Sequence, residues 1–255
     1  MSTVRSPMQE ALDELSQKWD IPTEISEIHF GKRDDLTEKI VKVGEVFFHM
    51  PFLAGPQLYV LWKCLWPDCH NCCEQPIRLP MTENDIELMR NKLGYKTKSD
   101  FIKNETTVIT FQDKAINDVL ITHSMLSMKR KKDETSKDDG KKISCRFLTS
   151  SGCGIHPDKP GVCWMFPFLP WRESGDQWWK TESHAKFVFT GACPGFYLDK
   201  SLDPIMPTLQ DYSKKIYDYL ISCHSSQRNS YISTSKTIQY RFLCDLPSTN
   251  IKSLK

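Results

Sequence analysis

Four of the chain's ten cysteines lie close together, at Cys64, Cys69, Cys72 and Cys73. Free cysteines in a protein core are usually scattered singly, as small buried hydrophobic residues. A C-x2-C pair such as Cys69 and Cys72 can turn two sulfur atoms toward one point, as zinc sites and iron–sulfur clusters both require. Turn-forming prolines, aspartate and asparagine surround these cysteines, so we expect them on a loop. The spacing predicts a metal-binding loop over residues 64–73, called the cysteine loop below.

A second group of cysteines follows much later in the chain, in turn-rich sequence. Together with the cysteine loop it provides eight candidate thiolate ligands, enough for two four-thiolate sites or for one cluster with additional structural or reactive thiols. Thiolates are soft ligands that select zinc or iron–sulfur clusters over magnesium, calcium or manganese. The members of this distal group are Cys145, Cys153, Cys163 and Cys193.

The choice between zinc and an iron–sulfur cluster depends on the surroundings of these thiols. Only Cys69 and Cys72 have C-x2-C spacing, whereas structural zinc sites commonly use two separated pairs. The aromatic and proline-rich run 164–171 that follows Cys163 would cover a cluster and exclude water; an exposed binding platform is the alternative for this run. We therefore expect an iron–sulfur cluster, with zinc as the alternative. A thiol–disulfide exchange site is disfavoured, because Cys73 and a nearby proline do not suit the helix start that such motifs use.

The remaining histidines and cysteines carry weaker signals. His70 and His156 lie within the cysteine motifs, and we expect them to support the site or to lie on the surface rather than to ligate metal. The other residues have no spacing that suggests more than packing or exposure. They are His123, His184, His224, Cys223 and Cys244.

The order of these motifs resembles the YkgJ-type cysteine-cluster family, which is named for its CxxCxxCC motif and whose members are regarded as zinc- or iron-chelating proteins. The resemblance covers about residues 60–197 and implies that the eight cysteines of the two groups form the metal site. The matching pieces are the cysteine loop, Met81-Thr82-Glu83-Asn84-Asp85-Ile86, Cys145-Arg146-Phe147-Leu148, Cys153-Gly154-Ile155-His156, the run from Lys159 to Phe168, and Cys193-Pro194-Gly195.

The chain departs from the family pattern at several points, and the family itself leaves the activity open. The first gap in the cysteine loop is longer, and Lys159 stands where the family has an arginine, whose bidentate fork a lysine lacks. The family includes relatives of flagellin lysine N-methylase, so a protein lysine N-methyltransferase is one alternative function and a zinc-stapled interaction module is another. We see no glycine-rich loop after a strand that would mark an ordinary nucleotide or S-adenosylmethionine site. Whether the protein is an enzyme is left open by these residues.

Composition excludes some classes of partner. The 255-residue chain has a formal net charge of +2, which gives no global electrostatic basis for binding nucleic acid. The most apolar stretch, Val46 to Trp66, is interrupted by charged residues and prolines, so we expect no membrane span. The N-terminus lacks an apolar secretory segment, which predicts a cytoplasmic, reducing location where metal explains ten cysteines better than disulfides do. We expect the partner to be another protein.

These observations predict an α+β fold with a small, irregular core of short strands and loops that carry the cysteines, flanked by helices. We expect residues 1–58 to form an N-terminal helical extension, residues 59–200 the cysteine-cluster domain, and residues 201–255 a C-terminal helix with a Ser/Thr-rich tail. The charged segment 129–142 is expected to be a flexible insertion, because it has too few apolar residues to bury.

Periodicity and capping signals predict the individual elements. We expect helices over about residues 8–19, from Asp34-Asp35 to Phe47, from Thr82 to Gly94 and over 205–223. A hairpin is predicted over 106–126, and short strands over 143–148 and 238–243. Thr82 and Asp85 have capping-box spacing.

Overall fold

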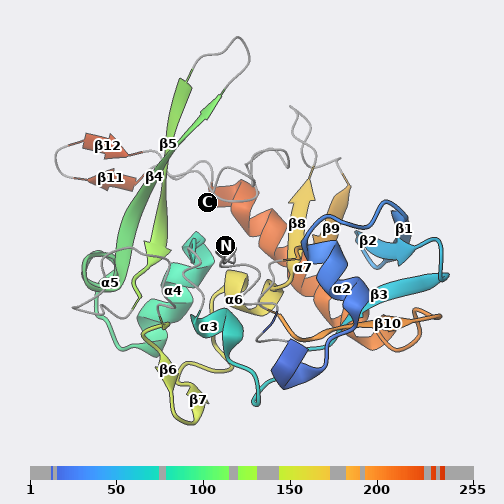
Figure 1. Ribbon diagram of the computed structural model, residues 1–255. Helices are drawn as coiled ribbons and strands as arrows, with labels where there is room; N and C mark the ends of the chain where they lie inside the picture. Colours follow the sequence, from blue (N-terminus) through green and yellow to red (C-terminus); the bar gives the residue numbers. More distant parts are fainter. Residues whose placement is uncertain are drawn as a thin grey trace, which may run out of the picture.

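The computed structural model describes residues 13, 16–74, 79–114, 120–130, 144–172, 182–189, 193–226, 231–233 and 236–238. Helices and strands are both abundant, which confirms the predicted α+β class. A curled sheet and the long helix α7 form one part of the molecule, and a projecting β-hairpin with two helices forms the other (Figure 1). Each part has its own cluster of buried hydrophobic side chains.

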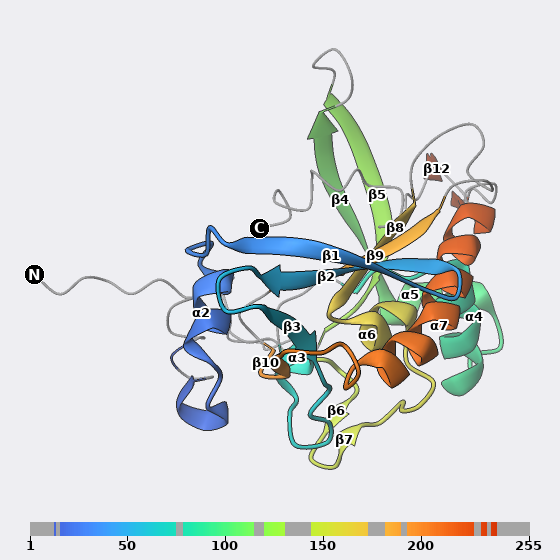
Figure 2. The ribbon, with the colours of Figure 1, turned by 90° about the vertical axis from the view of Figure 1, so that its right-hand side faces the viewer.

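The curled sheet has six strands in the order β10-β3-β2-β9-β8, with β1 paired to β2. β2 and β9 run parallel, and the other pairs are antiparallel. Alternate residues of β2, such as Val46, Phe48 and Met50, point into the core, where helix α7 packs against the sheet (Figure 2). The bounds are β1 Leu36–Val43, β2 Val46–Leu53, β3 Leu58–Trp62, β8 Phe168–Arg172, β9 Ser183–Phe187, β10 Phe196–Asp199 and α7 Met206–Ser226.

Helix α7 confirms the helix predicted over 205–223. Leu209, Ile216 and Leu220 recur at helical spacing and have no exposed surface. This apolar stripe faces the sheet, as expected of an amphipathic helix that buries one side.

The helix predicted from Asp34-Asp35 to Phe47 is wrong, because this stretch forms the hairpin β1–β2. Four apolar residues in it happen to match a helical period, but its β-branched residues favour a strand. Gly44 lies at the turn with a φ of 55°, in the left-handed region that glycine adopts readily. The sheet therefore combines strands from both sides of the boundary predicted at residues 58 and 59.

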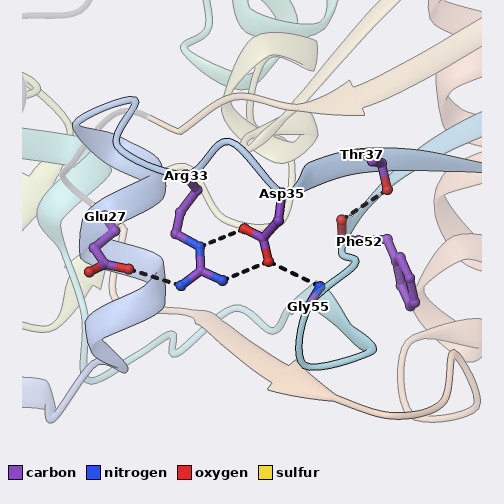
Figure 3. A network of polar contacts seen from close by, with 6 residues as sticks. All are labelled: Glu27, Arg33, Asp35, Thr37, Phe52 and Gly55. Carbon is purple, nitrogen blue, oxygen red and sulfur yellow. Dashed lines mark hydrogen bonds and ion pairs between the residues drawn. The ribbon is translucent and has the colours of Figure 1, made fainter.

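Asp35 joins three segments instead of starting a helix (Figure 3). Its carboxylate accepts two hydrogen bonds of 2.8 Å from the guanidinium of Arg33 and one of 3.1 Å from the backbone N–H of Gly55. Arg33 also donates to Glu27, 3.0 Å away on helix α2 (Thr23–His29). The network ties α2 to the start of β1 and to the β2–β3 turn.

The second part of the molecule contains the predicted hairpin and the predicted capped helix. Thr82 accepts a hydrogen bond from the N–H of Asp85, and Asp85 accepts one from the N–H of Thr82, so the capping box is confirmed. Gly94 follows this helix with a φ of 72°, as expected of a helix-ending glycine. The bounds are α4 Glu83–Lys92, α5 Lys98–Glu105, β4 Thr106–Lys114 and β5 Leu120–Met128.

Short elements connect the two parts. They are α3 Asn71–Glu74, β6 Leu148–Thr149, β7 Gly152–Cys153 and α6 Gly161–Met165. After α7, β11 Tyr231–Ser233 and β12 Lys236–Ile238 form a separate two-stranded sheet. The strand predicted over 143–148 is reduced, within the described residues, to one bridge at Cys145 and to β6. Most of the charged segment 129–142, the start of the predicted helix 8–19 and the end of the predicted strand 238–243 lie outside the described residues. In the part of the chain that is described, no helix has the length and apolar character to cross a membrane.

Candidate metal centre

All eight predicted metal ligands line one cavity of about 140 Å³ between the two parts of the molecule. Each is a free cysteine. The cavity wall also contains large aromatic side chains from distant segments of the chain. They are Trp62, Trp66, Trp164, Phe166 and Tyr212. The structure thus brings the cysteine loop and the distal group together at one place.

The cysteine loop follows β3 and turns back on itself. The N–H of Cys69 donates to the carbonyl of Leu65 at 3.0 Å, which closes a turn around the Pro67-Asp68 sequence. The N–H of Cys73 donates to the carbonyl of His70 at 2.8 Å, and Cys72 and Cys73 lie on the short helix α3. Tight turns of this kind allow several thiols of one short segment to face the same space.

Strand pairing places Cys193 beside the start of the cysteine loop. Phe196 of β10 pairs with Trp62 of β3, and the N–H of Lys63 donates to the carbonyl of Gly195 at 2.9 Å. A side chain on Gly195 would overlap the carbonyl oxygen of Lys63, so only glycine permits this close approach of the two chains. The indole N–H of Trp62 donates to the sulfur of Cys193 at 3.2 Å.

Cys145 and Cys163 lie near Cys73, and Cys153 lies near Cys163. The N–H of Cys145 donates to the carbonyl of Cys73 at 2.7 Å, and the guanidinium of Arg130 donates to the same carbonyl at 2.9 Å. Cys153 belongs to β7, which pairs with β6, and Cys163 lies on α6. The cavity therefore has one end near Cys193 and another near Cys145.

Asp85 fixes the position of helix α6 and, through it, of Cys163. One oxygen of its carboxylate accepts the capping hydrogen bonds of α4, and the other accepts a 2.7 Å hydrogen bond from the N–H of Gly161. Gly161 begins α6, and an added Cβ would lie 2.8 Å from the ring of Tyr219. A buried carboxylate with all these donors links the starts of two helices that are 76 residues apart.

Burial controls the ionisation of the cavity thiols. Burial, together with the nearby thiols of Cys145, Cys72 and Cys153, raises the pKa of Cys163 to about 12. Burial also raises the pKa of Cys193 to about 12, although the donors from Gly195 and Trp62 oppose this rise. Thiols that resist ionisation need a cation beside them to become thiolates, which is what a bound metal supplies.

Cys72 and Cys73 behave differently because they contact each other. A hydrogen bond from the Cys73 thiol to the Cys72 sulfur lowers the pKa of Cys72 to about 7 and raises that of Cys73. The positive charges of Lys159 and Arg130 also lower the pKa of Cys72. Both cations line the cavity, so the centre contains positive charge that can balance thiolates.

The two histidines of the cysteine motifs pack around Trp66. The ring of His156 stacks on this indole with an interplanar angle of 6° and a centroid distance of 6.0 Å, and His70 lies 5.2 Å from it at a tilt. A side chain on Gly152 would overlap the same indole. His156 lines the cavity and His70 does not.

The thiols line the same cavity, but their sulfur atoms are not arranged around a single point. Within the described residues, no three Cys, His, Asp or Glu side chains are grouped as ligands of one metal ion. Cysteine has a single side-chain torsion with three staggered positions, so a rotamer change moves the sulfur while the backbone stays in place. An all-sulfur donor set of this kind fits zinc or an iron–sulfur cluster.

The family model that matches this chain is called CxxCxxCC and is described as a "putative zinc- or iron-chelating domain"; it covers residues 63–193. The chain belongs to this family. The matched segment contains all eight cysteines of the cavity, from Cys64 to Cys193, and its description supports a protein that binds metal through cysteines. No curated protein and no solved structure matches the chain.

Some residues of this CxxCxxCC centre were not predicted from the sequence. Trp62, Arg130 and Tyr212 line the cavity but lie outside the cysteine motifs. The position of Trp62, two residues before Cys64, could have indicated its place in the site. Arg130 and Tyr212 are brought to the cavity only by the fold. The aromatic run 164–171 is divided, with Trp164 and Phe166 at the cavity and later residues in β8.

Proposed function

We propose that the protein is an iron–sulfur protein of the CxxCxxCC family that acts in electron transfer or as an accessory to another enzyme. The observation that carries this proposal is the convergence of eight free cysteines, from segments up to 129 positions apart in the chain, on one cavity. Eight thiols in one place exceed what core packing needs, since buried cysteines that only pack are usually isolated.

The walls of the cavity support an iron–sulfur cluster over zinc. The cavity has about 140 Å³ and its walls carry the rings of Trp62, Trp164 and Tyr212. Apolar walls keep water from a cluster, and the indole N–H that donates to Cys193 is the kind of hydrogen bond that tunes a cluster's potential.

The positions of the thiols support two groups of four. Strand pairing and the turn at Cys69 bring Cys64, Cys69 and Cys193 together. Cys72 lies between the two groups, since it interacts electrostatically with Cys69 and Cys193 and also with Cys163. The backbone hydrogen bond from Cys145 to Cys73 places these two residues together in the other group. The proposed ligand sets are Cys64, Cys69, Cys72 and Cys193 at one end, and Cys73, Cys145, Cys153 and Cys163 at the other.

This grouping differs from the division of the chain into the cysteine loop and the distal group. Cys193 joins the loop and Cys73 joins the distal thiols, so the adjacent residues Cys72 and Cys73 serve different centres. The two thiols contact each other in this structure, so this division requires their sulfur atoms to separate when metal binds. Each centre would then connect distant segments of the chain and stabilise the fold.

The test is anaerobic purification followed by iron, acid-labile sulfide and zinc analysis together with a visible absorption spectrum. We expect a brown protein with iron and sulfide in equal amounts and with visible absorbance that bleaches on reduction. A colourless protein with stoichiometric zinc and no sulfide would overturn the cluster and favour the zinc-stapled module. No observation on the described residues favours the lysine N-methyltransferase alternative.

A further inference from the structure

Strand β1 lies at the edge of the curled sheet, with one side bonded to β2 (Figure 2). Within the described residues, β2 is the only strand that pairs with β1. The strand has eight residues, Leu36–Val43, and is long for an open edge. Native proteins usually keep edge strands short or cover them, because a row of open N–H and C=O groups is a template for another strand. The outer edge of β1 is therefore a candidate interaction surface.

The backbone groups that point away from β2 belong to Glu38, Ile40 and Lys42. The N–H of Ala54 donates to the carbonyl of Asp35 at 3.0 Å, so the backbone of Asp35 points toward the β2 side. Hydrogen bonding alternates along each strand of an antiparallel pair. Every second residue after Asp35 therefore bonds to β2, and the residues between them present their N–H and C=O groups at the open edge.

The side chains of the same three residues lie on the outer face of the sheet. Residues directly opposite each other in a ladder share a face, and Ile40 is opposite His49, whose neighbours in β2 are buried in the core. Ile40 is 60% exposed and is the most exposed large hydrophobic side chain among the described residues. Glu38 and Lys42 lie two positions to either side of it, so an exposed apolar residue is flanked by opposite charges.

Contacts within the sheet hold both charges on this face. The carboxylate of Glu38 uses one oxygen for His49, 2.9 Å away, and the side chain remains 51% exposed. The ammonium group of Lys42 lies over the ring of Phe47, 4.9 Å from its centroid. Both groups can therefore reach a charge on a neighbouring strand.

We propose that β1 pairs antiparallel with β1 of a second copy of the chain, with the two-fold axis beside Ile40. The same surface of both copies then forms the interface, as in most dimers of identical chains. Ile40 faces the partner's Ile40, and Glu38 faces the partner's Lys42. The outward backbone groups of these residues meet in one continuous ladder. This inference does not depend on the proposed function.

Charge complementarity selects this register over its neighbours. With the axis beside Lys39, two lysines would face each other, and like charges directly opposite are destabilising. With the axis beside Val41, Ile40 would face a lysine. Lysines on an edge strand usually discourage pairing, but in the proposed register Lys42 faces a glutamate and Lys39 faces a valine.

The experiment measures the mass of the anaerobically purified, metal-loaded protein by light scattering over a range of concentrations, with a thiol reductant present to prevent disulfides. We expect the mass to rise from that of one chain toward that of two. Glu38→Lys should weaken the dimer about 10-fold to 100-fold, because both symmetry-related charge pairs become repulsive. Lys42→Glu should have the same effect. The double variant Glu38→Lys/Lys42→Glu should restore the dimer, because opposite charges face each other again.

Amide hydrogen exchange on the wild-type protein gives a readout that needs no substitution. The N–H groups of Glu38, Ile40 and Lys42 should become protected as the concentration rises. Those of Lys39 and Val41 bond to β2 and should be protected at every concentration. A mass of one chain at the highest concentration would overturn the proposal. So would a dimer in which the Ile40 amide exchanges freely, or a folded double variant that stays monomeric.

Discussion

The carboxylate of Asp85 accepts a 2.7 Å hydrogen bond from the backbone N–H of Gly161. The same side chain closes the capping box of α4, so one residue sets the start of α4 and of α6 together. Because α6 carries Cys163, this contact positions a cysteine that is far away in the sequence. Asp85, the acidic residue of the family pattern in this segment, thus supports the metal centre by accepting a backbone hydrogen bond from α6.

Replacing Asp85 with asparagine should test this role. The amide keeps one acceptor oxygen but turns an N–H₂ group toward donors, so a buried N–H of Thr82 or Gly161 loses its partner, at a cost of about 1–3 kcal/mol. We expect the free energy of unfolding, measured with denaturant, to fall by this amount and bound metal to decrease. Asp100→Asn is the matched control, because Asp100 makes a similar contact with Thr97 on an exposed helix start; its cost should stay within about 0.5 kcal/mol. Equal losses in both variants would contradict the role.

Gly195→Ala should disturb the end of the cavity near Cys193. An added Cβ would overlap the carbonyl oxygen of Lys63, so β3 and β10 must separate, at a cost of about 1–3 kcal/mol or more. We expect a lower melting temperature and less bound metal. Gly154→Ala is the control beside another cysteine, because its Cβ would have only ordinary contacts of 3.4 Å and longer. A Gly195→Ala protein with wild-type stability and metal content would show that the close approach is unnecessary.

His29 predicts a loss of stability in acid. Burial lowers its pKa from 6.5 to about 4, against a donor contact with Phe189 that raises it. The unfolded chain therefore binds a proton between pH 6.5 and pH 4 while the folded protein does not, and stability falls as the pH is lowered through this interval. At pH 4.5 the loss amounts to roughly 2–3 kcal/mol.

His29→Gln removes the titrating ring and retains a donor for the carbonyl of Phe189. Denaturant unfolding of both proteins at pH 7 and pH 4.5 should show a smaller loss for the variant by roughly 2–3 kcal/mol. Acid also weakens metal binding through the thiols, but this effect is common to both proteins and cancels in the comparison. The same pH dependence in both would contradict the assignment.

The sequence was most informative where local signals and the fold agree. The capping box of Thr82 and Asp85, the hairpin β4–β5 and the apolar stripe of α7 were all predicted correctly, because each depends on turn chemistry or on a sustained period. The order of the cysteines and the family resemblance pointed to the eight residues that line the cavity. The position of Cys193 beside the cysteine loop was not predicted, because it depends on the pairing of β3 with β10.

The errors also have physical causes. Leu36, Ile40 and Val43 are spaced like a helix, but they lie on a strand whose Ile40 remains 60% exposed. Its burial pattern therefore gives no clear alternation. The contact of His184 with His49 could not be predicted either, because the two residues are 135 positions apart. Contacts of this kind depend on sheet order, which one sequence does not specify.

The central claim is that cysteines from both ends of the family domain hold metal in one cavity. The most direct test is metal content per chain, measured anaerobically, in the wild type and in the Cys69→Ser, Cys163→Ser and Cys193→Ser variants, with Cys223→Ser and Cys244→Ser as controls. Serine keeps the size of cysteine but is a poor ligand for soft metals. We predict that each of the first three variants loses a large part of its metal and melts at a lower temperature, whereas the two controls keep both. Full metal in Cys163→Ser and Cys193→Ser together with a loss in Cys223→Ser would contradict the claim.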